Sequence, residues 1–407
     1  MLPFSIDEGV KNCIHKEHYE FWKNLGAEVG GPLYLGLFTW LKSCLKREKY
    51  EKIFFLARDG YNLYQLFGKY TDEKTEYLMT SRRALLLAGI SKLDEETMQI
   101  LPPFTLGQTI KEVLEYLGVL EICQDSIKEA GFESVDEIIH TREEMEQVKK
   151  LYTLNETAFL KKCEEERQEA YRYFKEKGFF DVDSIVFDCG WNGSSQYLLD
   201  RFLECVDYQK NNKFFYTGIL NTEKSKRQLN GRKFETYLFN YDENYNLQNK
   251  VKDSIVIMEL FFGAPMNSVY KYENGVAVLE DIPEETAYKE AISQGIIAFV
   301  ERSIDFVEKY KIRVKQEHAV TAILHLIHEP TEKEAVTIGN IANVDGFANQ
   351  KAVIKYIAKL DEASYKENPQ IEIYWAEGLF KRPDIDEKLK KQIAQDRHLN
   401  YKDAETD

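Results

Sequence analysis

The chain has 407 residues, of which 43% are hydrophobic, and its 54 Lys and Arg against 69 Asp and Glu give a formal net charge of −15. This length is sufficient for two or three structural units with a large core. The negative charge argues against a general binder of nucleic acid or of anionic membranes, because neither partner would be attracted at long range. A small anion in a locally basic pocket remains compatible with it.

The six cysteines are irregularly spaced and form no Cys-x-x-Cys pair, which argues against a zinc cluster or a disulfide scaffold and favours a reducing compartment. Residues 1–20 carry charges and lack the apolar stretch of a signal peptide. No window reaches the roughly 18 to 20 apolar residues that a membrane span requires. We therefore expect a cytoplasmic protein with no membrane span.

The first predicted strand covers residues 53–57 and runs into the loop Arg58-Asp59-Gly60, which a helix over 61–70 follows. A second short strand is predicted over 76–80, ending at Ser81-Arg82-Arg83. This β-α-β spacing is typical of parallel neighbouring strands that are joined by a crossover helix.

Residues 91–180 are rich in Glu, Lys and Gln at helical spacing. We interpret them as a helical insertion between two strands, with a separate helical domain as the alternative. The sheet resumes with strands over 184–187 and 213–220, and Asn274-Gly275 predicts a later hairpin. The expected fold is α/β, a Rossmann-like, mostly parallel sheet built from 1–90 and 181–270. The insertion covers 91–180, and a hairpin with a helical C-terminal region covers 271–407.

The loop after the first strand has the residue types of an anion or metal site. An Asp at this position, Asp59, can bind Mg²⁺ or act as a nucleophile toward phosphorus. Arg58 can hold a phosphate through two parallel hydrogen bonds, and Gly60 lets the backbone approach a ligand. The structural alternative is that Asp59 only caps the next helix and pairs with Arg58.

Two further segments are expected at the same edge of the sheet. Ser81-Arg82-Arg83 would add two guanidinium groups to that of Arg58. Asp188, after the strand at 184–187, is a second candidate catalytic and metal-binding carboxylate. The loop behind it offers donors for a phosphate or a sugar hydroxyl and an aromatic ring that could stack or simply pack: Trp191, Asn192, Gly193 and Ser194. Neither loop matches a dinucleotide-binding or P-loop pattern.

Two other residues in this region carry reactive groups. Cys189 has an acidic neighbour and no His close in sequence, so we interpret it as structural. Glu259 lies in an otherwise apolar run and is predicted to sit on a buried helix, either paired with a buried Arg or acting as a general base.

Taken together, these motifs resemble bacterial proteins described as predicted hydrolases of the haloacid dehalogenase superfamily, which often accompany surface-polysaccharide genes and glycosyltransferase domains. The resemblance spans about residues 20–270 and rests on five segments: Gly31-Pro32, 55–60, 81–83, 187–194 and 259–265. The Asp-x-Asp-x-Thr motif of that superfamily is absent, since Asp59 is followed by Gly60 and Tyr61. The chain therefore resembles the companion domain of those proteins. A looser likeness to phosphoribosyltransferases is architectural only.

Three hypotheses follow. The first is a Mg²⁺-assisted hydrolase or transferase that acts on a phosphorylated or nucleotide-activated sugar in surface-polysaccharide metabolism. The second is a non-catalytic domain that binds the same anion within polysaccharide and glycosyltransferase machinery. The third is a structural module whose Arg and Asp residues form a buried ion-pair network. In the first, Asp59 and Asp188 are catalytic, and the substrate is bound by Arg58, Gly60, Ser81, Arg82, Arg83, Trp191, Asn192, Gly193, Ser194 and Glu259.

Overall fold

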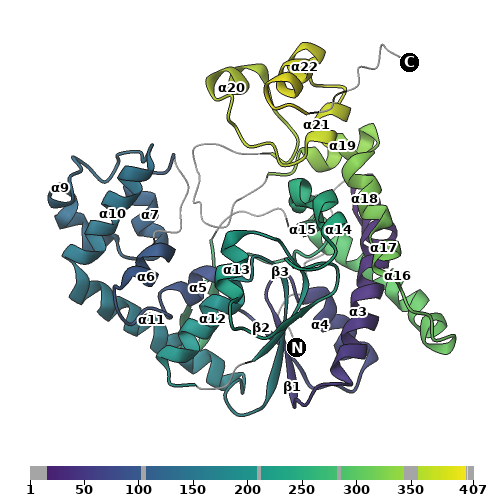
Figure 1. Ribbon diagram of the computed structural model, residues 1–407, viewed down its shortest axis with the longest axis horizontal. Helices are drawn as coiled ribbons and strands as arrows, with labels where there is room; N and C mark the ends of the chain where they lie inside the picture. Colours follow the sequence, from purple (N-terminus) through teal and green to yellow (C-terminus); the bar gives the residue numbers. More distant parts are fainter. Residues whose placement is uncertain are drawn as a thin grey trace.

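A computed structural model of the chain describes residues 16–101, 107–208, 212–281, 286–342, 356–399 and 401. A five-stranded parallel sheet lies at its centre, with helices on both faces (Figure 1). The strands are β1 (Lys52–Leu56), β2 (Thr75–Leu78), β3 (Ser184–Trp191), β4 (Lys213–Ile219) and β5 (Phe234–Thr236). Their spatial order is β2-β1-β3-β4-β5, and every neighbouring pair is parallel. The predicted α/β class with a mostly parallel sheet is confirmed.

Consecutive residues of each strand contribute to two apolar cores, as the two-residue period of a strand requires. In β1, Ile53 and Phe55 belong to the first core, whereas Phe54 and Leu56 belong to the second. Three helices cover the first core: α3 (Gly31–Leu45), α4 (Tyr61–Tyr70) and α16 (Ala287–Lys309). Three others cover the second: α5 (Arg82–Leu86), α11 (Glu156–Glu176) and α12 (Ser194–Cys205). Because both faces are covered, the strand sequences are nearly continuous apolar runs.

The segment between β2 and β3 is helical and forms the arm at the left of Figure 1. Its other elements are α6 (Glu95–Ile100), α7 (Ile110–Leu117), α8 (Leu120–Cys123), η2 (Gln124–Ser126), α9 (Ile127–Ala130) and α10 (Arg142–Leu154). The arm shares the second apolar core with the sheet, and Phe174 of α11 packs against Phe202 of α12 at a ring-centroid distance of 5.1 Å.

The C-terminal region enters the core through α16, which packs along the N-terminal helices. These are α2 (Lys16–Leu25), the π-helical turn η1 (Gly26–Gly30) and α3. Glycines permit the close approach, since a Cβ atom at Gly26 would lie 2.1 Å from the carbonyl oxygen of Ile292 and one at Gly31 would lie 2.4 Å from the ring of Phe299. The start of α16 is thereby fixed beside the sheet.

The remaining elements are a two-stranded hairpin and further helices. Asn274 and Gly275 both have positive φ, as the two-residue hairpin turn predicted from their sequence requires. The elements are α13 (Glu223–Leu229), α14 (Tyr245–Val251), η3 (Lys252–Ser254), α15 (Ile255–Glu259), β6 (Val269–Glu273), β7 (Val276–Leu279), α17 (Gln316–Ala319), α18 (Thr321–His328), α19 (Glu332–Gly339), α20 (Glu362–Glu367), α21 (Ala376–Lys381) and α22 (Glu387–Asp396). Among the residues described, none of the helices has both the length and the apolar character for crossing a bilayer.

Candidate functional site

The strand order creates a crevice between β1 and β3. The chain leaves β1 outward to β2 and then returns to the other side of β1 as β3, so the connections from these two central strands diverge. In open α/β sheets, ligands bind at such a point, beyond the carboxyl ends of the strands. Phe55 pairs with Phe187, which brings Asp188 level with the end of β1 and next to the loop that carries Asp59. The first and third sequence motifs therefore meet at this crevice.

Asp59 and Asp188 form an interacting carboxylate pair. Asp188 is only 5% exposed, and its burial raises its pKa to about 7, an effect to which the charge of Asp59 adds. Hydrogen bonds from the Ser195 hydroxyl and the Cys189 backbone N–H oppose that rise. Burial also raises the pKa of Asp59, against the lowering effect of nearby cations. Both carboxyl groups therefore ionise less readily than in water, and the charge of either one disfavours ionisation of the other.

Lys289 brings a cation to this pair from the distant part of the chain. It lies in the first turn of α16 and is buried. Burial lowers the pKa of its ammonium group to about 7, the positive charge of Arg58 lowers it further, and Asp59 opposes both. Arg58 itself is half-buried in the loop after β1. Two cations are thus close enough for the charge of one to disfavour that of the other, an arrangement that a bound anion would stabilise.

Arg82 extends the positive region toward α13. Its side chain is exposed at the start of α5, and its charge lowers the pKa of both Asp59 and Asp188. Burial lowers the pKa of Lys224 on α13, and the charges of Arg82 and Arg227 lower it further. The charge of Arg82 therefore acts both on the carboxylate pair and on Lys224, which lies with Arg227 on α13.

Arg83, the next residue, faces the other way. Its side chain is buried and donates hydrogen bonds to the carbonyl oxygens of Tyr116 (2.8 Å) and Leu117 (3.1 Å) in the helical arm. It also forms an ion pair with Glu166 at 3.6 Å and lies 4.5 Å from the ring centroid of Tyr270. These contacts give Arg83 a role in fixing the arm to the sheet.

Ser81 also makes local contacts. Its hydroxyl donates to the carbonyl oxygen of Val269 at 2.5 Å and accepts a hydrogen bond from the backbone N–H of Ala84, which caps α5. The Ser-Arg-Arg motif therefore divides into a cap, one arginine at the crevice and one arginine at the arm.

The strand predicted over 184–187 is longer in the structure, because β3 continues to Trp191 by pairing with β4, so Asp188 and Trp191 lie in the strand and not in a loop. The segment from Trp191 to Ser194 is held by packing and hydrogen bonds. Trp191 is buried, and its ring packs against those of Phe239 and Phe262. The Asn192 side-chain oxygen accepts hydrogen bonds from the hydroxyls of Thr222 and Ser225, and the Ser194 hydroxyl donates to Gln228 at 2.9 Å. Gly193 precedes α12 with a φ of +69°, a conformation that glycine adopts without strain. These contacts fix the backbone amides at the start of α12.

The structure corrects the expectation for Glu259. The carboxylate is exposed at the end of α15, while Ile257 and Met258 make the apolar contacts of that helix. Burial raises the pKa of the Cys189 thiol well above its usual range, and the charges of Asp59, Asp188 and Glu259 raise it further. A protonated, buried thiol is not a nucleophile, which agrees with a structural role for Cys189.

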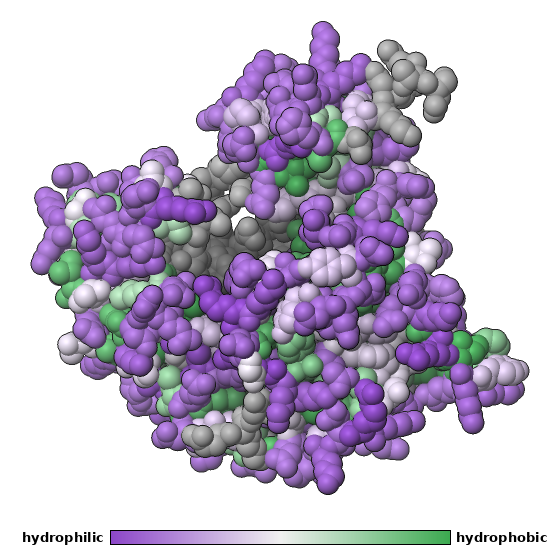
Figure 2. All heavy atoms as spheres, viewed as in Figure 1, coloured by the Kyte–Doolittle hydropathy of each residue, from purple (hydrophilic) through white to green (hydrophobic). Residues whose placement is uncertain are grey.

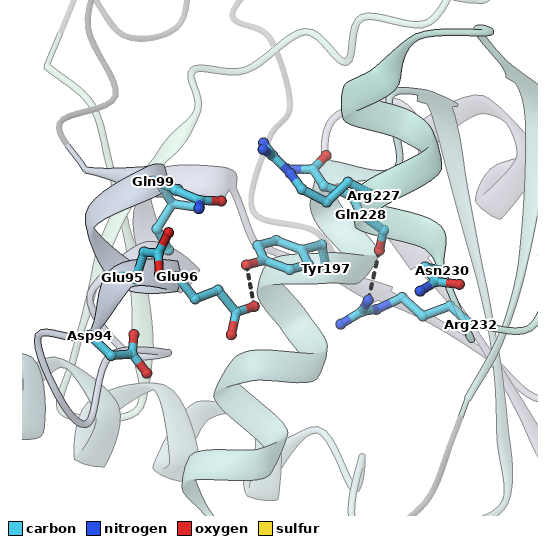
Figure 3. A pocket seen from close by; sticks show the side chains of 10 residues that line it. Asp94, Glu95, Glu96, Gln99, Tyr197, Arg227, Gln228, Asn230 and Arg232 are labelled. Carbon is cyan, nitrogen blue, oxygen red and sulfur yellow. Dashed lines mark hydrogen bonds between the residues drawn. The ribbon is translucent and has the colours of Figure 1, made fainter.

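A cavity of about 580 Å³ lies beside the crevice, between α6, α12 and α13 (Figure 3). In Figure 3 the Tyr197 hydroxyl points to Glu96, to which it donates a hydrogen bond of 2.7 Å. Arg227 and Gln228 belong to its lining, whereas Asp59 and Asp188 do not. The cavity is therefore separate from the carboxylate pair, although Gln228 in its lining accepts the hydrogen bond of Ser194. A second cavity, of about 840 Å³, lies apart from it, lined by residues of α2 and η1 and by Lys333 and Glu334 of α19.

Sequence reasoning missed Lys289 as a site residue. A usable signal was present, because Lys289 falls on the same face of its helix as Ile292 and Ile296, and a lysine on an apolar face indicates a partner or a function. Ser195, which donates to Asp188, was expected from the sequence as one of the neutral donors of this segment.

The donor set at the crevice fits a magnesium ion. Proteins usually hold Mg²⁺ through one or two carboxylates, with substrate phosphates and water completing the octahedron. Asp59 and Asp188 supply two such carboxylates. The described residues contain no cluster of three or more His, Cys, Asp and Glu side chains that would form an all-protein metal site. Comparison of the sequence with protein-family models and with curated proteins gave no match.

Proposed function

We propose that the chain is an enzyme that acts on a phosphorylated or nucleotide-activated sugar, by phosphoryl or glycosyl transfer or hydrolysis. One observation carries this proposal: a carboxylate pair with raised pKa values, the buried Asp188 and the partly exposed Asp59, interacts with the charges of Arg58, Arg82 and Lys289 at the switch point of a parallel sheet. Groups with strongly perturbed pKa values gather at functional sites, and in this acidic protein the cations mark a place for an anion.

The proposed roles follow from charge and position. Arg58 and Arg82 bind the phosphate, and Lys289 becomes fully charged as the anion binds. Without a metal, the carboxyl group that keeps its proton can donate it to a leaving oxygen, while the ionised one accepts a proton from the attacking group. With Mg²⁺ bound, Asp59 and Asp188 would both be ionised and would hold the ion, which supplies neutralisation of charge on the phosphate oxygens.

The cellular setting is proposed from the resemblance to proteins encoded beside surface-polysaccharide genes. We place the activity in the cytoplasm, next to glycosyltransferase machinery. A non-catalytic anion-binding domain is the second candidate. It is favoured by the fixed loop after β3, where Asn192 and Ser194 already have protein partners.

A thermal-shift screen of sugar phosphates and nucleotide sugars, with and without Mg²⁺, tests both candidates. The enzyme hypothesis expects stabilisation by at least one ligand, loss of that stabilisation in Arg82→Gln, and a product that Asp59→Asn no longer forms. Lys226→Gln is the matched control, because Lys226 is an exposed cation that pairs with Glu223 on α13. Stabilisation without any product would support the binding domain, and no response to any anion would contradict both.

A further inference from the structure

The end of α16 and the turn that follows it project from the body of the protein at the right of Figure 1. This basic-aromatic tip, residues 306–315, exposes large apolar side chains. Phe306 and Tyr310 are each 58% exposed, and Ile312 is 42% exposed. The rings of Phe306 and Tyr310 pack against each other with centroids 4.8 Å apart. Figure 2 shows hydrophobic atoms at the same projection.

Cations alternate with these apolar side chains. Residues 309–315 read Lys-Tyr-Lys-Ile-Arg-Val-Lys, with four basic residues and no acidic one, in a chain of net charge −15. The acidic residue of the tip, Glu308, forms an ion pair with Lys42. All four cations are exposed: Lys309, Lys311, Arg313 and Lys315. The tip combines positive charge and apolar area on one small projection.

The tip is anchored to the core, so its shape is part of the fold. Val307 is buried in the first apolar core, and Val314 packs against that core from the other side of the turn. Gln316 donates a hydrogen bond of 3.0 Å to the carbonyl oxygen of Tyr237. The exposed side chains are therefore presented by a fixed turn between two anchors.

We infer that the basic-aromatic tip docks the protein on an anionic lipid surface. Aromatic and aliphatic side chains ringed by Lys and Arg suit the boundary between headgroups and acyl chains, where long basic side chains bury their stems and keep their charges in water. The negative net charge of the chain does not prevent this docking, because charges farther from the membrane than about 8 Å are largely screened at physiological salt. A nucleic-acid partner would leave the exposed Phe306 and Ile312 without an apolar environment, which makes the lipid surface the better match.

Co-sedimentation of the full chain with vesicles tests the inference. One set of vesicles is pure phosphatidylcholine, and the other contains about one third phosphatidylglycerol, which is anionic. Near an anionic surface each Lys or Arg increases partitioning to the vesicle by about fivefold. The wild-type chain is expected to bind the anionic vesicles. Neutralising the tip with Lys309→Gln, Lys311→Gln, Arg313→Gln and Lys315→Gln is expected to reduce that binding by on the order of several hundredfold.

Two further variants separate docking from general charge effects. The matched control removes four exposed cations elsewhere, with Lys128→Gln, Lys150→Gln, Lys161→Gln and Lys388→Gln, and is expected to keep tight binding. Phe306→Ser with Ile312→Ser is expected to weaken binding by about tenfold or more while leaving its salt dependence in place. Circular dichroism checks that each variant is folded.

Several results would overturn the inference. The wild-type chain could fail to bind anionic vesicles. The tip and control quadruple variants could also lose vesicle binding to the same extent. Concentration-dependent dimerisation that Phe306→Ser and Ile312→Ser abolish, with no change in vesicle binding, would assign the tip to a second copy of the chain. Tip-dependent binding of duplex DNA without vesicle binding would assign it to nucleic acid.

Discussion

Replacing Asp188 by Asn is expected to stabilise the protein at pH 8 and to leave its stability at pH 4 nearly unchanged. Asp188 is 5% exposed, and burial beside Asp59 raises its pKa from a usual value of 3.8 to about 7. Each pKa unit corresponds to about 1.36 kcal/mol, so full ionisation of Asp188 costs the folded state about 4 kcal/mol. Asn keeps the shape and can still accept the Ser195 hydrogen bond, but it carries no charge.

The sign of the pH dependence follows from proton counts. Between about pH 4 and pH 7 the unfolded chain has lost the Asp188 proton while the folded chain still holds it, so stability falls as the pH rises. Above about pH 7 both states are ionised and the loss is complete. Urea unfolding of wild type and Asp188→Asn at several pH values from 4 to 8 should give curves that diverge by up to about 4 kcal/mol.

Asp125→Asn provides the control for this experiment, because Asp125 is exposed in η2 and its replacement should leave the pH profile of the wild type intact. Parallel stability profiles for wild type and Asp188→Asn between pH 4 and pH 8 would refute the reasoning. They would mean that Asp188 is not ionising in a buried place beside another carboxylate.

Three other predictions concern single residues. Arg83→Met should cost about 3–5 kcal/mol in urea unfolding because the carbonyl oxygens of Tyr116 and Leu117 lose their buried donor and Glu166 is left with Lys162 as its partner, whereas Arg82→Met should cost less than about 1 kcal/mol and instead weaken sulfate binding; equal losses of stability would contradict the division of roles. Gly190→Ala should lower the urea midpoint by the equivalent of about 2–4 kcal/mol, since φ is +112° and the new Cβ would lie 2.4 Å from the Gly218 carbonyl oxygen. The control Gly68→Ala on α4, where the new Cβ would have no atom within 4 Å, should be neutral or stabilising. A neutral Gly190→Ala would count against the β3 geometry. Sulfate affinity, measured by calorimetry, should fall as the pH rises above about 7, because Lys289, whose pKa is lowered to about 7, loses its charge while Asp188 gains one. Lys289→Met should make this profile shallower and leave the part due to Asp188, whereas Lys226→Met should not change it. Equal slopes in wild type and Lys289→Met would disprove the link.

The sequence alone was enough to locate β1 to β4 and the polar residues at their carboxyl ends, although β3 runs four residues beyond its predicted end. Strands such as 53–56 are short apolar runs that end in Gly and charged residues, and these are local signals of backbone conformation. The same holds for the hairpin, whose Asn274-Gly275 turn requires two residues that accept positive φ. The sequence also placed Arg58, Asp59 and Asp188 after or near the ends of strands.

Only the tertiary structure decided which side chains share the crevice. Arg82 and Arg83 are neighbours in sequence, but successive residues of a helix point about 100° apart, so one faces Asp59 and the other the helical arm. Lys289 reaches the site because Gly26 and Gly31 let α16 pack closely, and the burial of Glu259 was predicted from composition although its position on α15 exposes it. A local pattern fixes the period of the backbone, whereas the partner of each charged side chain depends on packing between segments that are hundreds of residues apart.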